Sequence, residues 1–429
     1  MRWFLCLLLC VLGQGIEASS YGCKGLANLR QVPSVEGKDG VFFRIQSDLK
    51  MDHGFSTQAI ENLAGLSAAL AQGGTHLIYL PVPAKSLAMP HALPDASGLF
   101  GFEPEIATWV MADLTARLEK AGVATVNAAP EMARLPKSKP PFHKTDFHWT
   151  AWGAETAARL VAQRMSQFST YQDMEKSRYH TQSTGHDIAH SNLRGLLQQQ
   201  CEETLPSVAS EQFETQLLAN EDSVLDIFGT SDISPQIVLV GTSFSARQGS
   251  NFSGFLSQHS GLEVTIRALS GGNQFGSIQD YLTSDAFLNA RPKFLIWENP
   301  IYHRLTHQGS QVFAGLRAAA LDDCRLLESR MVEGVAKVVL PEAYEQDVLL
   351  IEARSDVLRK AQVTFTSIKG DGRTRVVKRT KRQHGTNRIF VAMSGLWKAN
   401  PVSASVNVGQ APESDLIFKL CNSKTRSPS

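Results

Sequence analysis

The sequence predicts an α/β domain, in which helices flank a mostly parallel sheet, followed by a smaller all-β sandwich. Through the first three quarters of the 429 residues, strand-like apolar runs alternate with segments of helical periodicity, a pattern typical of a parallel sheet covered on both faces. Beyond Leu321, short strand-like runs separated by polar turns replace this alternation, which favours an antiparallel sandwich. With 43% hydrophobic and 19% charged residues, the chain has the composition of a globular protein.

The N-terminal stretch has the composition of a secretory signal peptide. Arg2 precedes a short apolar run that ends in small residues, so we expect cleavage after Ala18. The run is too short to span a bilayer well, and no later segment is apolar enough to cross a membrane. We therefore expect residues 1–18 to be removed and the mature protein to be soluble and exported.

The α/β domain is expected over residues 19–321. Apolar residues at helical spacing, or in short buried runs, mark its elements, and Thr150 is placed to cap the helix that follows it. The expected helices lie at 57–72, 103–121, 150–165 and the end of 268–282, and the expected strands within 75–83, 122–129, 236–245 and 293–300.

The β-rich module is expected over residues 322–422, with a mobile tail at 423–429. Its strand-like runs are VAKVVLP, DVLLIEAR, QVTFTSI, TRVVKRT, RIFVAMS, ASVNVGQ and DLIFKL. From Arg325 onward there are 18 Lys and Arg against 10 Asp and Glu, whereas Ser19 to Cys324 holds 23 against 30. This asymmetry predicts two surfaces with different partners.

Four cysteines remain after signal removal, and an even number in an oxidising compartment favours two disulfides. Three pairings are possible, and spacing alone does not choose among them. Cys324 and Cys421 bracket the basic segment, which makes their pairing a natural staple for the module. Cys23 and Cys201 would then tie the N-terminal arm to the first domain.

A serine nucleophile is suggested by the stretch VLVGTSFS. Ser243 directly follows a buried strand and a glycine, at the sheet edge where α/β proteins place their ligands. A helix beginning there offers N–H groups to an oxyanion. The alternative is that Ser243 only caps that helix. For Ser245 we expect either capping or support of the neighbouring residues.

The stretch TDFHWT supplies a base and an orienting acid. Asp146 can reach one imidazole nitrogen of His148 and leave the other free, as a serine nucleophile requires. A buried hydrogen-bonded pair without chemistry is the alternative. A metal site from His143, Asp146 and His148 is another, whereas the i,i+4 pair His186 and His190 lacks helical periodicity around it.

Two further segments offer polar groups to the same edge. The turn ALSGGNQFG brings Gly272 and Asn273 after a strand, where they are further candidates for oxyanion donors; an ordinary turn is the alternative. Trp297 and Glu298 in IWENP either line a cleft or close a strand.

The basic module predicts binding to an anionic polymer. Alternate residues of a strand share a face, so Arg373 and Arg375 are expected together, as are Arg379 and Lys381. A nucleic acid fits this charge pattern, but an exported protein seldom meets one; a solvated basic loop is the alternative. The expected binding residues are Arg373, Arg375, Lys378, Arg379, Lys381, Trp397 and Lys398.

Two motifs together resemble those of the alginate O-acetyltransferases of the AlgX and AlgJ kind, SGNH-hydrolase-like proteins of the bacterial periplasm. The D-x-H-W-[ST] signature matches residues 146–150, and the G-T-S-[YF]-S signature matches residues 241–245. The order of serine and histidine is reversed relative to ordinary SGNH hydrolases, as it is in this family. The likeness covers about residues 40–321, and the β-rich segment and four cysteines resemble the carbohydrate-binding module and disulfide arrangement of AlgX.

This resemblance implies a periplasmic O-acetyltransferase that acts on an exopolysaccharide, most of all on mannuronate residues of alginate. Ser243 would carry the acetyl group, with His148 as base and Asp146 as its orienter. It implies no cofactor and no metal, a donor delivered by other acetylation proteins, a link to the envelope secretion complex and a monomeric chain. An acetyl esterase and a non-catalytic polysaccharide-binding scaffold remain as alternatives.

Overall fold

The structure is a computed structural model that describes residues 19–218, 235–305, 309–354, 357–397, 400–409 and 415–424. The expected signal peptide, residues 1–18, and residues 425–429 of the expected tail lie outside this range. Among the described residues, no helix has both the length and the apolar character needed to cross a bilayer.

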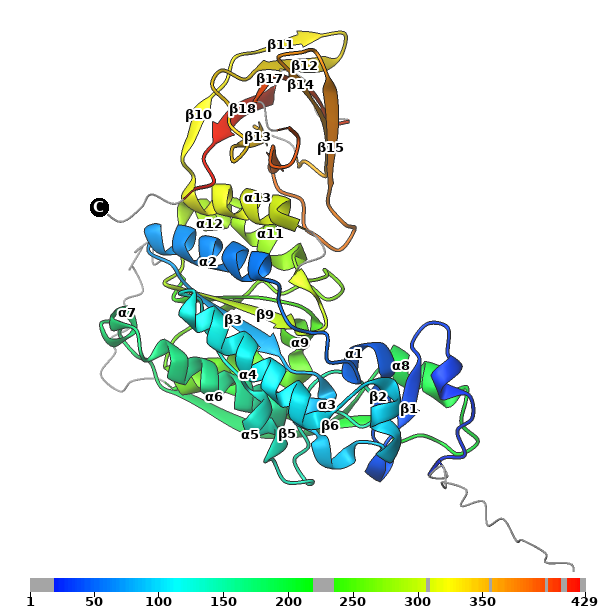
Figure 1. The fold of residues 1–429 in the computed structure, drawn as a ribbon. Helices are drawn as coiled ribbons and strands as arrows, with labels where there is room; N and C mark the ends of the chain where they lie inside the picture. Colours follow the sequence, from blue (N-terminus) through cyan, green and yellow to red (C-terminus); the bar gives the residue numbers. More distant parts are fainter. Residues whose placement is uncertain are drawn as a thin grey trace, which may run out of the picture.

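A parallel sheet of five strands forms the centre of the first domain, in the order β4-β3-β9-β7-β8 (Figure 1). Its inner strands are buried along their length, because helices cover both faces. The strands are β3 His76–Val82, β4 Ala124–Thr125, β7 Ile237–Val240, β8 Val264–Ile266 and β9 Phe294–Pro300. Parallel pairing confirms the α/β prediction.

Two helical layers enclose the sheet. The first layer consists of α6 Ala151–Met165 and α10 Phe252–Ser260, which pack on one face. Thr150 caps α6 as expected, because its side chain accepts from the N–H of Gly153. The other layer consists of α2 Thr57–Gln72, α4 Pro104–Lys120, α11 Gly276–Leu282, α12 Asp285–Asn289 and α13 Gly309–Leu321. The predicted helix positions are confirmed to within a residue or two for α2, α4 and α6.

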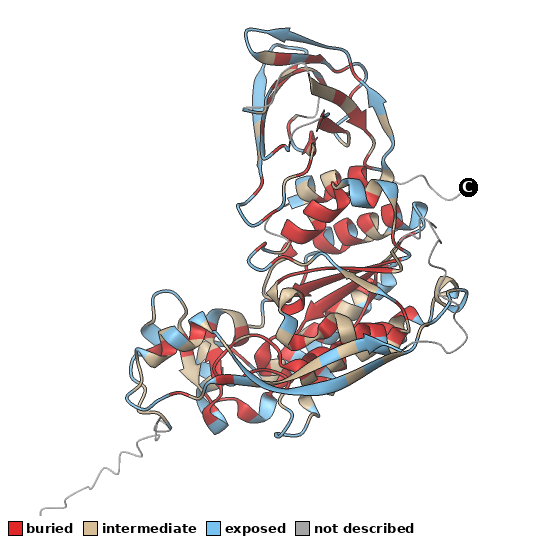
Figure 2. Cartoon of the chain, turned by 180° about the vertical axis from the view of Figure 1, so that it is seen from behind, coloured by how far each residue is buried: buried red, intermediate tan, exposed pale blue. Residues whose placement is uncertain are grey.

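A long antiparallel ribbon crosses the lower side of the domain in Figure 1, and it is largely exposed in Figure 2. It consists of β5 Tyr179–Ala189 and β6 Val208–Leu217. Smaller elements complete the domain: η1 Leu26–Asn28, β1 Ser34–Glu36, η2 Lys38–Gly40, β2 Phe42–Arg44, α1 Ile45–Asp48, α3 Lys85–Ala88, η3 Pro90–Ala92, η4 Asp95–Phe100, α5 Ala129–Ala133, α7 Ser169–Gln172, α8 Asn192–Gln198, α9 Ser243–Ala246 and η5 Gln248–Ser250.

The C-terminal module is a sandwich of two antiparallel sheets, as predicted. A four-stranded sheet has the order β10-β18-β13-β16, and a five-stranded sheet has the order β11-β12-β17-β14-β15; one apolar core joins them. The strands are β10 Cys324–Leu326, β11 Ser329–Val332, β12 Val335–Val339, β13 Val348–Ala353, β14 Lys360–Ser367, β15 Gly372–Lys378, β16 Arg388–Ala392, β17 Pro401–Asn407 and β18 Leu416–Cys421.

The module stands on α11 and α13 (Figure 1), and buried arginines join it to the first domain. Arg379 Nη1 donates to the Asp280 carboxylate at 2.8 Å, and Arg388 Nη2 donates to the Ser284 carbonyl at 2.7 Å. The expectation that Arg379 and Lys381 share an exposed strand face is therefore wrong: β15 ends at Lys378, and Arg379 is only 8% exposed.

Both favoured disulfides are present. Cys23–Cys201 ties the N-terminal arm to the end of α8, and Cys324–Cys421 joins the paired ends of β10 and β18. The mobile tail was expected to begin at residue 423. Ser423 is instead buried, and its hydroxyl donates to the Gln346 carbonyl, so this residue belongs to the folded module.

Candidate active site

Ser243 begins α9, directly after β7 and a tight turn whose shape Glu298 fixes. The buried Glu298 carboxylate, at the end of β9, accepts from the Thr242 N–H at 2.7 Å and from the Ser245 hydroxyl at 3.0 Å. A Cβ at Gly241 would lie 2.5 Å from Glu298 Oε2, so only glycine fits there. Burial raises the pKa of Glu298 to about 7, although these donors oppose the shift. Ser245 therefore has the supporting role expected of it.

His148 lies on a loop that doubles back on itself before α6. Phe142 and Trp149 form an isolated antiparallel bridge that closes the loop, and the Thr150 N–H donates to the Pro141 carbonyl at 2.9 Å. The indole N–H of Trp149 donates to the Phe244 carbonyl at 2.9 Å. This last bond joins the histidine loop to the serine turn, so two segments distant in sequence form one site.

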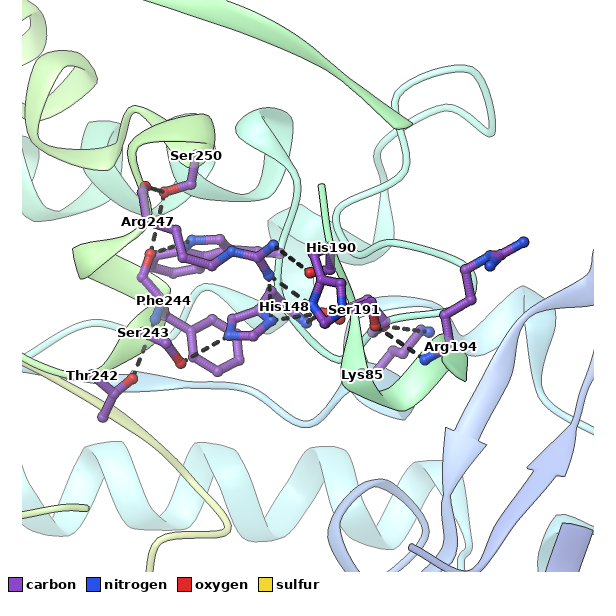
Figure 3. Close-up of polar contacts among 12 residues, drawn as sticks. Lys85, His148, His190, Ser191, Arg194, Thr242, Ser243, Phe244, Arg247 and Ser250 are labelled. Atoms are coloured by element: carbon purple, nitrogen blue, oxygen red, sulfur yellow. Dashed lines mark hydrogen bonds and ion pairs between the residues drawn. The ribbon is translucent and has the colours of Figure 1, made fainter. Parts of the chain in front are cut away.

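Ser243, His148 and Asp146 form a continuous hydrogen-bonded chain, and Figure 3 shows the link between Ser243 and His148. His148 Nε2 lies 2.8 Å from Ser243 Oγ, and His148 Nδ1 lies 2.6 Å from Asp146 Oδ1. The same carboxylate oxygen accepts from the backbone N–H of His148 at 2.8 Å. With the proton on Nδ1 for Asp146, Nε2 is free to accept from the serine hydroxyl.

The electrostatic setting keeps the acid ionised and the base neutral. Burial raises the pKa of Asp146, but the hydrogen bond and charge of His148 outweigh it and hold that pKa below its ordinary value. Burial lowers the pKa of His148; Asp146 opposes this shift, and the charges of Arg247 and Arg44 add to it. A neutral imidazole beside an ionised carboxylate is the state that general-base catalysis needs.

Lys85 supports the histidine loop through hydrogen bonds to its backbone, a role that the sequence pattern around Lys85 does not indicate. Its ammonium is buried and donates to the carbonyl oxygens of Phe42 at 2.8 Å, Lys144 at 2.9 Å and Asp146 at 3.1 Å. Three acceptors take up the three ammonium protons. Burial lowers the pKa of Lys85 to about 7, while Asp48 and Asp146 oppose that shift.

Replacing Lys85 by Met is expected to destabilise the fold by about 3 kcal/mol, because it leaves three buried carbonyl groups without their donor. Thermal unfolding measures this loss. Lys144→Met is the matched control from the same loop: its exposed ammonium binds one carbonyl, that of Asp39. An equal loss in both variants would contradict the role given to Lys85.

The triad opens into a cavity of about 330 Å³. The ribbon forms one wall, with Asp187 and Ala189 from β5 and Ser210 and Gln212 from β6. The remaining lining comes from the histidine loop, α9 and η5: His143, His148, Trp149, Ser243, Phe244, Arg247, Gln248, Gly249 and Ser250. Ser243 and His148 both line this cavity, so a ligand that occupies it can reach the serine hydroxyl.

The histidines considered as metal ligands are not arranged as a metal site. Both ring nitrogens of His148 contact triad partners, Ser243 and Asp146. His186 lies within strand β5, so its spacing from His190 is not helical. Among the described residues, no three His, Cys, Asp or Glu side chains are arranged to hold a metal ion.

Two expected oxyanion donors lie elsewhere. The N–H of Gly272 donates to the Leu269 carbonyl at 3.2 Å within the turn after β8, so it is already engaged. Asn273 lines a separate cavity between the first domain and the module, and its side-chain oxygen accepts from the Phe275 N–H. These placements overturn both assignments.

The expected polymer-binding residues of the module separate into two groups. Arg373 and Arg375 share a face of β15 as predicted, but their guanidinium groups donate to the carbonyls of Leu396 and Ser394, and Arg373 stacks over Trp397. Lys378 and Lys381 are exposed. Lys398 lies outside the described residues.

Comparison with known proteins identifies the family of the first domain. Residues 35–301 match the family model described as "SGNH hydrolase-like domain, acetyltransferase AlgX". The alginate biosynthesis protein AlgX of Pseudomonas aeruginosa is 31% identical over 264 residues, which cover 62% of this chain and 55% of that protein. Its namesake in Azotobacter vinelandii is 30% identical over 275 residues, which cover 63% of this chain and 55% of that protein.

The chain thus spans little more than half the length of these relatives in sequence alignment. In three dimensions, the solved structure of Pseudomonas aeruginosa AlgX matches 96% of this chain and 99% of that one, with a TM-score of 0.78 and 23% identity. That match extends the likeness in fold to the β-sandwich. Since the family model covers more than half of the chain, the protein belongs to the AlgX family of SGNH hydrolase-like acetyltransferases.

Proposed function

We propose that this protein is an O-acetyltransferase that passes an acetyl group through Ser243 to a hydroxyl of an exopolysaccharide, with alginate as the acceptor. The observation that carries the proposal is the chain of contacts from Asp146 to His148 at 2.6 Å and on to Ser243 at 2.8 Å, facing a cavity. The names of the relatives, which are alginate biosynthesis proteins, support the choice of polymer.

In the first half-reaction, His148 Nε2 takes the proton of Ser243 as Oγ attacks the acetyl carbonyl of the donor. Asp146 stabilises the imidazolium that forms. The bond from the carbonyl carbon to the donor's leaving group breaks, and the leaving group receives the proton from His148. The Ser243 N–H, in the first turn of α9, is the donor we propose for the oxyanion.

In the second half-reaction, the acceptor hydroxyl gives its proton to His148 Nε2 and attacks the acetyl-enzyme. The new ester bond forms as the bond to Ser243 Oγ breaks, and the proton returns to the serine. We place this chemistry in the periplasm, since both disulfides fit an oxidising compartment. The module would hold the anionic chain near the site, and other acetylation proteins would deliver the donor.

Transfer and hydrolysis use the same triad, so the acceptor separates an acetyltransferase from an esterase. With p-nitrophenyl acetate as donor, we expect oligomannuronate to increase nitrophenol release and to gain acetyl groups detectable by mass spectrometry. Ser243→Ala is the control for uncatalysed transfer. Acetate release with no acetylated oligomer would mean that the protein is an esterase.

A further inference from the structure

Arg247 lies against the triad on the Nδ1 side of the imidazole, opposite Ser243. It follows α9 directly, and its Nη1 atom is 2.7 Å from His148 Nδ1 and 3.7 Å from the Asp146 carboxylate. The side chain is 27% exposed and lines the same cavity as Ser243. Figure 3 shows the guanidinium next to His148 and in contact with the His190 carbonyl.

This arrangement places two donors at one nitrogen. When Nδ1 of His148 donates its proton to Asp146, it has no lone pair left to accept a hydrogen bond from Arg247. The guanidinium cannot accept the Nδ1 proton either, because it has donors only. The positive charge of Arg247 also opposes the charge that His148 gains when it takes a proton. In the ligand-free protein, Arg247 therefore makes His148 a weaker base.

We propose, resting on the acetyltransferase function above, that Arg247 binds the carboxylate of a uronate acceptor. The bound carboxylate neutralises the positive charge of Arg247, so that this charge no longer opposes protonation of His148. A guanidinium matches a carboxylate with two parallel hydrogen bonds, which gives it both affinity and orientation. The acceptor thereby activates the base that deprotonates its own hydroxyl. Water makes no such contact and meets the weaker base, so transfer is favoured over hydrolysis.

The other charges around the site are consistent with this role. Arg44 acts on His148 from β2, His143 is buried within the histidine loop, and Lys85 is buried beside it. Asp187 lines the cavity from the ribbon, and its carboxylate accepts from the Ile188 N–H at 2.8 Å. Because Asp187 repels an anion, the acceptor carboxylate is expected on the Arg247 side of the cavity.

The test measures acetyl transfer to oligomannuronate and to the same oligomer with its carboxylates methyl-esterified, which removes the charge without adding a hydroxyl. We expect the native protein to acetylate the anionic oligomer at least about tenfold faster. Arg247→Gln should lose this preference, release acetate faster without acceptor, and show an acidic limb of its pH–rate profile at higher pH. A general loss of folding would not raise that rate or shift that limb.

Arg178→Gln is the matched control, since it removes an exposed arginine at the far end of the ribbon and should keep the preference. Arg247→Lys keeps the charge but not the paired donors, so it should lose most of the preference without the shift in pH profile. A preference retained by Arg247→Gln would overturn this inference and leave the proposed function intact. No acetylated oligomer with the native protein would overturn both.

Discussion

Replacing Ser243 by Ala is expected to lower acetyl transfer by at least about 10⁴-fold, because it removes the oxygen that lies 2.8 Å from His148 Nε2. The rate of oligomer acetylation, followed by mass spectrometry, measures the loss. Removal of one hydroxyl from a half-buried site should leave the thermal midpoint nearly unchanged. The variant thus separates chemistry from folding.

Ser245→Ala is the matched control from the same short helix. Its hydroxyl donates to Glu298 at 3.0 Å and does not contact His148, so the expected loss is about tenfold at most. In cells, Ser243→Ala should abolish polymer acetylation and leave polymer secretion intact. Acetylation that survives in this variant would support a scaffold role and reject the proposed mechanism.

Replacing Asp146 by Asn is expected to lower acetyl transfer by about 10³–10⁴-fold while leaving the loop in place. The amide can donate to Nδ1, which favours the tautomer with its proton on Nε2, pointing at Ser243. The rate of nitrophenol release from p-nitrophenyl acetate, followed across pH, measures the loss of activity. Activity within tenfold of the native protein would contradict the role of Asp146 as orienter.

The same pH–rate profiles also test the direction in which each variant shifts the pKa of His148. The reaction needs neutral His148, so the rate falls as pH drops through the pKa of that imidazole, which burial places below its ordinary value. Asp146 raises this pKa and Arg247 lowers it. Asp146→Asn should therefore move the acidic limb to lower pH, and Arg247→Gln should move it to higher pH.

The sequence was sufficient to predict many of the elements and the grouping of Asp146, His148 and Ser243, because both predictions depend on short local sequence patterns. Helical periodicity located α2, α4 and α6, and apolar runs located the inner strands. The triad members lie in two short motifs, each at the end of an identifiable element. Strands β12 to β18 of the module were predicted for the same reason, since polar turns separate them, whereas the short strands β10 and β11 were not predicted.

The remaining parts of the site depend on contacts between distant segments. Lys85 reaches loop carbonyls 59 and 61 residues away, and Glu298 fixes a turn 56 residues before it. Arg247 lies four residues after Ser243, a spacing of one helical turn that could have suggested a side chain near the nucleophile. The prediction that Arg379 lies on an exposed face was wrong, because its charge alone does not show that it forms a buried ion pair with Asp280.

The central claim, that Ser243 carries the acetyl group, is tested most directly by trapping the acyl-enzyme. The protein is mixed with p-nitrophenyl acetate, quenched in acid and mapped by peptide mass spectrometry, before and after oligomannuronate is added. We predict one acetyl group on the peptide that holds Ser243, lost when the oligomer is added as the oligomer becomes acetylated. Acetylated oligomer formed with no acetyl group on Ser243, or formed equally well by Ser243→Ala, would contradict the account.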